Sequence, residues 1–230
     1  MPTPFKTKSH CLFLLALLLC QLVACAPAGK LPKATGNAED YRRQAYQAIY
    51  EKRLNDGITS LQQAISLEPM GSDYLLLGDL QEANEQYRAA LKAYQKGIQY
   101  AFDAKTREEL NFHWATLEAF QYDRLDKATE LIAQLPADSA AALNLRTIQS
   151  LQRKHFDTAL QHSEQVVSDN QDQEMTGLAH YLAAQAWLNV GNESKAFQSL
   201  FFAINHARGH GLVARITRLW EELKKRPLPQ

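Results

Sequence analysis

Apolar residues recur at helical spacing from residue 38 onward, and no stretch alternates apolar and polar residues for long. This periodicity predicts amphipathic α-helices and argues against strands. Short runs of turn-forming residues interrupt the pattern at 55–57, 69–71, 136–138 and 191–192. Because these runs fall inside or between helical pairs, we expect the chain to be built from repeated pairs of helices.

A small residue recurs in the second helix of each expected pair, at intervals of roughly 34 residues. The aligned positions are Gly57, Ala90, Ala128, Ala159 and Ala196. Three positions before each of them lie Leu54, Tyr87, Leu125, Phe156 and Glu193, and the small position of the first helices is Ala45, Gly78, Thr116, Thr147 and Ala184. Helix axes can approach to about 8–10 Å only where the contact carries small side chains. The pattern therefore predicts close helix crossings at these positions.

The repeat resembles the tetratricopeptide repeat, a helix–turn–helix unit of about 34 residues. Leu77-Gly78 matches the Leu-Gly pair of that family, and Pro69 matches its terminal proline. The resemblance covers residues 38–204 and implies an all-α, right-handed superhelical solenoid of about five helix pairs. The chain departs from the family at Ser163, Glu193, Thr116 and Thr147, and only the first repeat keeps the proline. A generic helical bundle is the alternative.

Residues 205–230 are expected to form a basic C-terminal capping helix and tail. Leu212, Ile216, Leu219 and Leu223 share one face of this helix, with Trp220 beside them. A solenoid needs a terminal cap with one polar face. The basic residues of the segment are expected on a solvated outer face, and contact with anionic lipid is the alternative. They are Arg208, Arg215, Arg218, Lys224, Lys225 and Arg226.

The first 24 residues have the features of a signal peptide. Lys6 and Lys8 precede an apolar run over residues 12–19 that is too short for a confident membrane span. The sequence that ends at Cys25 resembles the lipobox of bacterial lipoproteins, which implies cleavage before Cys25 and lipid attachment to it. Residues 25–37 are then a lipidated cysteine and a flexible tether. An ordinary secretory leader and an uncleaved anchor are the alternatives.

Charge and composition exclude several classes of protein. The chain has 25 basic and 25 acidic residues, and loss of residues 1–24 removes Lys6 and Lys8 but no acid, so no nucleic-acid partner is expected. A mature chain with Cys25 as its one cysteine excludes a disulfide framework and a cysteine metal site. His206 and His210 lack a third ligand at suitable spacing. The sequence carries no phosphate loop or nucleophile motif, so no catalytic residue, metal or cofactor is expected.

The tetratricopeptide resemblance implies a concave groove, lined by the first helices, that binds a partner protein or peptide. Tyrosine and arginine are frequent binding hot spots, and asparagine and glutamine can bond an extended backbone. The family positions carried over to this sequence give Arg42, Tyr46, Tyr50, Asp79, Glu82, His113, Asn144, Gln152, Tyr181, Gln185 and Asn189.

Together these features favour a membrane-anchored protein–protein interaction scaffold. The chain resembles lipoproteins that assist envelope assembly, such as the pilotins of type IV pili and proteins of outer-membrane biogenesis. Ala26, in place of an aspartate after the lipobox cysteine, implies by the same resemblance an outer membrane location facing the periplasm. An adaptor that recruits or regulates peptidoglycan enzymes is the alternative, and an enzyme is a remote one.

Overall fold

A computed structural model describes residues 36–122, 124–133, 135–136, 138–169 and 172–225. The described residues belong to one compact unit, which comprises Ala34–Gln230. The predicted signal peptide, Cys25 and most of the tether lie outside the described residues. No helix in the described part of the chain is long and apolar enough to cross a membrane.

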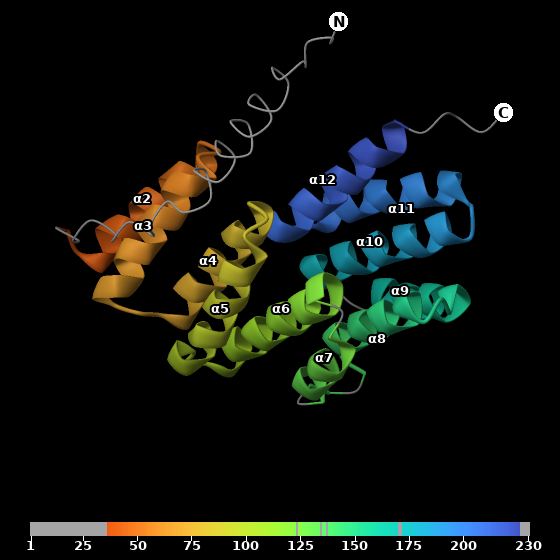
Figure 1. Cartoon of the computed structure of the whole chain (residues 1–230), viewed down its shortest axis with the longest axis horizontal. Helices are drawn as coiled ribbons and strands as arrows, with labels where there is room; N and C mark the ends of the chain where they lie inside the picture. The colour runs from red at the N-terminus through yellow and green to blue at the C-terminus, as the bar shows by residue number, and fades with distance from the viewer. Residues whose placement is uncertain (1–35, 123, 134, 137, 170–171, 226–230) are drawn as a thin grey trace, which may run out of the picture. The chain divides into compact units, whose positions relative to one another are not determined.

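The described residues form five helix pairs and one further helix, without a strand (Figure 1). Within each pair the two helices pack side by side, and successive pairs pack on one another. The pairs are α2 (Ala38–Tyr50) with α3 (Leu54–Leu67), α4 (Gly71–Ala83) with α5 (Tyr87–Gly97), α6 (Ala104–Tyr122) with α7 (Leu125–Ile132), α8 (Ala140–Gln152) with α9 (Phe156–Asp169), and α10 (Gln173–Asn189) with α11 (Glu193–His206). A short 3-10 turn, η1 (Ile98–Tyr100), follows α5, and α12 (His210–Lys224) follows the last pair. The predicted all-α, tetratricopeptide-like fold of five helix pairs is confirmed.

The second helices have the register that the repeat predicts. All five begin at the aligned position three residues before the small residue, which is Leu54, Tyr87, Leu125, Phe156 and Glu193 in turn. The small residues themselves are buried in every pair. Close packing of the two helices of a pair therefore depends on the same position in all five repeats.

Threonine fits the small position of two first helices because its hydroxyl is satisfied within the helix. Thr116 Oγ1 donates to the Phe112 carbonyl at 2.8 Å, and Thr147 Oγ1 donates to the Leu143 carbonyl at 3.0 Å. Both threonines are buried. A buried hydroxyl without a partner would be costly, so these bonds explain how the repeat tolerates a polar residue there.

Four of the turns inside the pairs, those whose residues the structure describes in full, have a common backbone conformation. Lys52, Glu85, Lys154 and Gly191 have φ values of 61°, 59°, 61° and 79°, and each lies two residues before its second helix. In the first pair, the Arg53 N–H donates to the Ala48 carbonyl at 2.8 Å, and the other three turns make the equivalent bond. This is the Schellman arrangement, which satisfies the last carbonyls of a helix. The run 55–57, expected as a turn, lies instead in the first turn of α3.

The last helix, α12, packs against α4 as well as against α11. Figure 1 shows α12 next to the end of α4, although well over a hundred residues separate them in the chain. Leu212, Ile216 and Leu223 of the expected apolar face are buried in the core formed with α6, α8, α10 and α11. The sequence predicts this helix and its buried stripe, but a cap on the last repeat alone would not reach α4.

Candidate partner-binding surface

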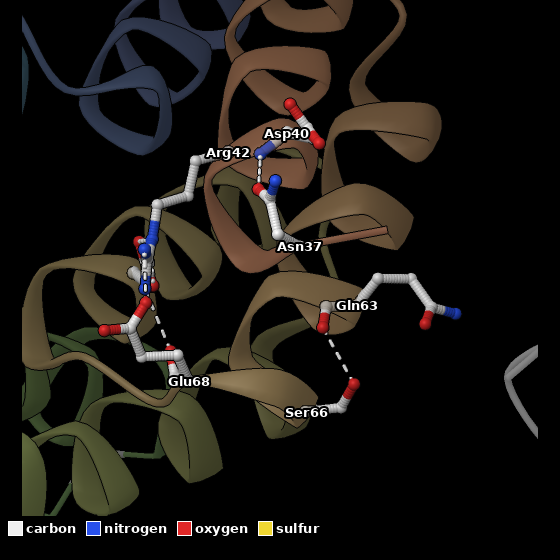
Figure 2. A network of polar contacts seen from close by, with 7 residues as sticks. Asn37, Asp40, Arg42, Gln63, Ser66 and Glu68 are labelled. Carbon is white, nitrogen blue, oxygen red and sulfur yellow. Dashed lines mark hydrogen bonds and ion pairs between the residues drawn. The ribbon is translucent and has the colours of Figure 1, made fainter. Parts of the chain in front are cut away.

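Arg42 on α2 links the first helix pair to the second. Its Nε lies 3.0 Å from Asp73 Oδ2. Its Nη1 lies 3.0 Å from Glu68 Oε2, and its Nη2 donates to the Glu68 carbonyl at 2.9 Å (Figure 2). Burial alone would lower the pKa of Arg42, but the hydrogen bonds to Glu68 and Asp73 outweigh it and raise that pKa. The guanidinium therefore has its hydrogen-bond partners within the protein and links the first helix pair to the second.

Tyr46 and Tyr50 lie one helical turn apart on α2 and point to solvent. Their relative exposures are 61% and 84%, which are high values for aromatic side chains. Residues four apart on a helix lie on the same face, so the two rings form one exposed aromatic surface. Among the predicted groove residues, these two are the exposed aromatic side chains, and aromatic rings are the more common binding hot spots.

Asp79 and Glu82 on α4 are occupied by α12. Asp79 Oδ2 accepts the His210 N–H and Oδ1 accepts the Gly211 N–H, both at 2.7 Å. Asp79 thereby caps the free amides at the start of α12, a role that an acidic side chain fills well. Burial raises the pKa of Asp79, and the backbone hydrogen bond from Gly211 and the nearby His113 oppose that rise.

Glu82 forms a buried ion pair with Arg215 of α12. Arg215 Nη2 lies 2.5 Å from Glu82 Oε2, and the side-chain exposures are 12% and 7%. Glu82 Oε1 also accepts the Tyr94 hydroxyl at 2.8 Å. Burial alone would lower the pKa of Arg215, but the Glu82 carboxylate outweighs it and raises that pKa. Arg215 was expected on a solvated outer face, and that expectation is wrong because α12 turns it toward α4.

Three further predicted residues contact neighbouring helices. The His113 ring on α6 stacks on Tyr94, with 5.4 Å between ring centroids. Asn144 on α8 is fully buried and donates to the Met175 carbonyl at 3.0 Å, while Gln152 donates to the Ala119 carbonyl at 2.8 Å. These amides hold adjacent helix pairs together, because each one reaches a backbone carbonyl of another pair.

The α10 residues differ in accessibility. Tyr181 is buried and its ring lies 6.3 Å from Phe120; burial raises the pKa of its hydroxyl, although Arg215 and a hydrogen bond with Gln185 oppose the rise. Asn189 is exposed, and its Nδ2 donates to the Gln185 carbonyl at 2.9 Å. Asp79, Glu82, Asn144 and Tyr181 are buried and therefore not open to a partner, which corrects their placement in an open groove. Partner binding itself stays a prediction.

A cleft of about 460 Å³ lies between α9, α10 and α11. Its walls include Leu160, Ser163, His180, Trp187 and Lys195, and the Lys195 ammonium lies 4.1 Å from the centre of the Trp187 ring. The sequence alone did not single out this cleft. The lining residues of this cleft come from three helices, so they do not form a recognisable pattern in the sequence.

His180 in this cleft makes stability depend on pH. Its ring stacks on Phe202 at 5.3 Å, and burial, helped by the nearby His206, lowers its pKa from the usual 6.5 to about 4. Between these two values the unfolded chain binds a proton that the folded chain does not. The contribution of His180 to stability is therefore complete above pH 6.5 and falls as the pH drops toward 4.

His180→Phe should remove this part of the acid sensitivity, because phenylalanine keeps the stacking without a titratable nitrogen. Thermal midpoints at pH 7 and pH 4.5 should lie closer together in the variant than in the wild type. His155→Phe changes an exposed histidine and should leave the difference unchanged. Equal acid sensitivity in all three proteins would contradict the lowered pKa of His180.

Among the described residues, no three histidine, cysteine or acidic side chains are grouped so as to hold a metal ion.

Neither a protein-family model nor a curated protein matches the chain. Several solved structures are similar to it, three of which follow. The MamA protein has 16% identity and a TM-score of 0.47, over 74% of this chain and 91% of that chain.

The other two structures cover similar shares. YrrB, described as a tetratricopeptide-repeat protein with an unusual peptide-binding site, has 17% identity and a TM-score of 0.45, over 79% of this chain and 92% of that chain. A tetratricopeptide-repeat protein from Parabacteroides merdae has 15% identity and a TM-score of 0.47, over 80% of this chain and 87% of that chain. The three similarities cover 74–80% of this chain at identities of 17% or less.

Proposed function

We propose that the mature protein is a lipid-anchored scaffold at the outer membrane, facing the periplasm, that binds other envelope proteins during assembly of a pilus, secretion or outer-membrane complex. The observation that carries the proposal is the exposed pair Tyr46 and Tyr50 on α2. Tyrosine is enriched among the residues that dominate protein–protein binding. Because Arg42 fixes α2 to the second pair, the two rings stand on a firmly held helix.

The anchor in this proposal is a lipid on Cys25. The lipobox-like sequence before Cys25 supports it. One acyl chain alone binds a membrane only marginally, so stable attachment needs more than one chain. Residues 25–37 separate the anchor from α2, which begins at Ala38 behind its cap Asn37. The aromatic pair would then lie in the helix nearest in sequence to the membrane attachment.

Loss of both rings should remove partners without weakening the fold. A tagged Tyr46→Ala, Tyr50→Ala protein should recover fewer envelope proteins from extracts than the wild type, because truncation of a hot-spot residue costs about 2 kcal/mol of binding. That corresponds to roughly a thirtyfold loss of affinity. The thermal midpoint should stay unchanged, because both side chains are exposed.

Phe102→Ala is the matched control, because Phe102 is an exposed aromatic residue between α5 and α6. It should recover the same proteins as the wild type. Full recovery with the double variant at unchanged stability would refute the tyrosine surface. The recovered proteins also identify the system: peptidoglycan enzymes, rather than assembly components, would select the adaptor alternative.

Replacement of the proposed lipid-bearing cysteine should block both modification and processing. Labelled palmitate should enter the wild-type protein in cells and be absent from Cys25→Ser, which should accumulate as the precursor. Cys20→Ser, directly after the apolar run, is the control and should be labelled normally. Palmitate incorporation that survives Cys25→Ser would exclude this anchor.

A further inference from the structure

Four carboxylates hold the start and the basic face of α12. We call Asp79, Glu82, Glu85 and Glu174 the acidic seat. Asp79 accepts the His210 and Gly211 amides at 2.7 Å, and Glu174 Oε2 accepts the Arg208 and Gly209 amides at 2.6 and 2.8 Å. Glu82 pairs with Arg215, and Glu85 pairs with Arg218. The seat therefore binds both the amide end and the guanidinium groups of one helix.

The seat selects a particular helix by its shape as well as by its charge. A Cβ on Gly209 would lie 2.7 Å from Glu174 Oε1, and a Cβ on Gly211 would lie 3.0 Å from Glu82 Cβ. The backbone of the helix start can approach the carboxylates this closely because both residues are glycine. Arg215 and Arg218 are three residues apart and so lie on one face of the helix. The pattern is a Gly-x-Gly start followed by two basic residues.

The contacts on the other side of α12 are less complete. A cleft of about 190 Å³ remains between α11 and α12, lined by Phe201, Ile204, Ile216, Thr217 and Trp220. Phe201 and Ile204 on α11 keep 56% and 39% of their surface exposed. Part of the α11 face next to α12 is therefore left uncovered. The seat, together with the apolar stripe buried against α6, α8, α10 and α11, holds α12 as it would hold a bound helical ligand.

The buried Glu82–Arg215 pair supports the same view. Removing two charges from water is costly, and the attraction between them often does no more than offset that cost. Charge complementarity chiefly gives specificity for one partner over another. A seat made of four carboxylates is thus better suited to recognising a helix than to holding it permanently.

We propose that the acidic seat is a binding site for a basic amphipathic helix of a partner protein, and that α12 is a built-in occupant which such a helix replaces. The partner helix has glycines at its start, two basic residues at the spacing of Arg215 and Arg218, and an apolar stripe like that of Leu212 and Ile216. This site is separate from the tyrosine surface of the proposed function, so either can fail without the other.

The test uses the full chain with α12 weakened by Arg215→Met, and a fluorescent peptide of residues 207–225 as the probe. Because α12 occupies the seat, the peptide can bind only to the fraction of the protein in which α12 has left it, and its apparent affinity is reduced by that fraction. The peptide should bind Arg215→Met at least tenfold more tightly than the wild type. A control peptide that carries Arg215→Met and Arg218→Ala should bind neither protein, and Glu82→Gln added to the Arg215→Met chain should abolish peptide binding.

Equal binding of the two peptides to the weakened chain would overturn the proposal. A concentration-dependent dimer of Arg215→Met, seen by light scattering, would overturn the partner assignment and make a second copy the occupant. If Arg215→Met does not fold, hydrogen exchange of the wild-type protein tests the proposal instead. Amides of α12 that exchange through a local opening, well before those of α10, support a replaceable helix, and simultaneous exchange of α12 and α10 overturns it.

Discussion

Gly78→Ala is expected to lower the free energy of unfolding by about 3 kcal/mol, at the upper end of the usual cost of overpacking. A Cβ at this position of α4 would lie 2.2 Å from Tyr94 Cε1 and 2.6 Å from its Cδ1. The Tyr94 ring is fully buried, and its hydroxyl is held by Glu82, so the ring cannot move aside without breaking other contacts. Alanine would gain about 1 kcal/mol of helix propensity, which does not offset the clash.

Gly57→Ala on α3 is the matched control. Its nearest atom would be Ile49 Cγ1 at 3.1 Å, a tight contact that the isoleucine side chain relieves by shifting a few tenths of an ångström. We expect its stability to remain within about 1 kcal/mol of the wild type, because the gain in helix propensity is of similar size to the cost of the contact. Urea unfolding followed by circular dichroism measures both variants. Equal stability of Gly78→Ala and Gly57→Ala would mean that the Tyr94 ring can move away from the added Cβ.

The register of the repeats was predictable because it rests on a local steric requirement. The close crossing of two paired helices demands a small residue at one fixed position, and Gly57 and Ala90 show this plainly in the sequence. Departures from the family also fit local chemistry. Glu193, expected to be apolar, is the first residue of α11 behind its cap Asn192, where an acidic side chain favours the helix dipole.

The turns inside the pairs were less predictable because the sequence carries no common signal for them. A positive φ is usually marked by glycine. Here glycine occupies that position only at Gly191 among the four described turns, and lysine or glutamate occupies it at Lys52, Glu85 and Lys154. The Schellman bonds are made by backbone atoms alone, so different side chains give the same turn.

The seat of α12 could not be predicted from repeat spacing. Spacing tells which residues face the inner side of a solenoid, and it placed Asp79 and Glu82 there. It does not tell whether a distant segment covers that side. Arg215 lies 133 residues after Glu82, and each alone has the composition of an ordinary solvated position. Their pairing depends on how the whole array of helices brings α4 to α12.

Because the Glu82–Arg215 pair is buried, removing either charge should have a large effect. Loss of one partner of a buried ion pair typically costs about 3–5 kcal/mol, since the remaining charge has no compensation. Glu82→Gln should be destabilising in this way although glutamine can still accept the Tyr94 hydroxyl. Arg215→Met keeps an unbranched side chain next to Phe120, whose ring lies 5.1 Å from the Arg215 guanidinium, and leaves the carboxylate unpaired.

The double variant Glu82→Gln, Arg215→Met is expected to be more stable than the sum of the single losses indicates, with a coupling of about 2 kcal/mol or more. Neither side chain is then charged, so the desolvation cost that penalises each single variant disappears. Urea unfolding of the wild type, both single variants and the double variant gives the coupling directly. Arg218→Ala, which breaks the more exposed pair with Glu85, should cost no more than about 1 kcal/mol. Additive losses in the cycle would show that Glu82 and Arg215 do not share a desolvated contact, and α12 would then be held mainly by its apolar stripe.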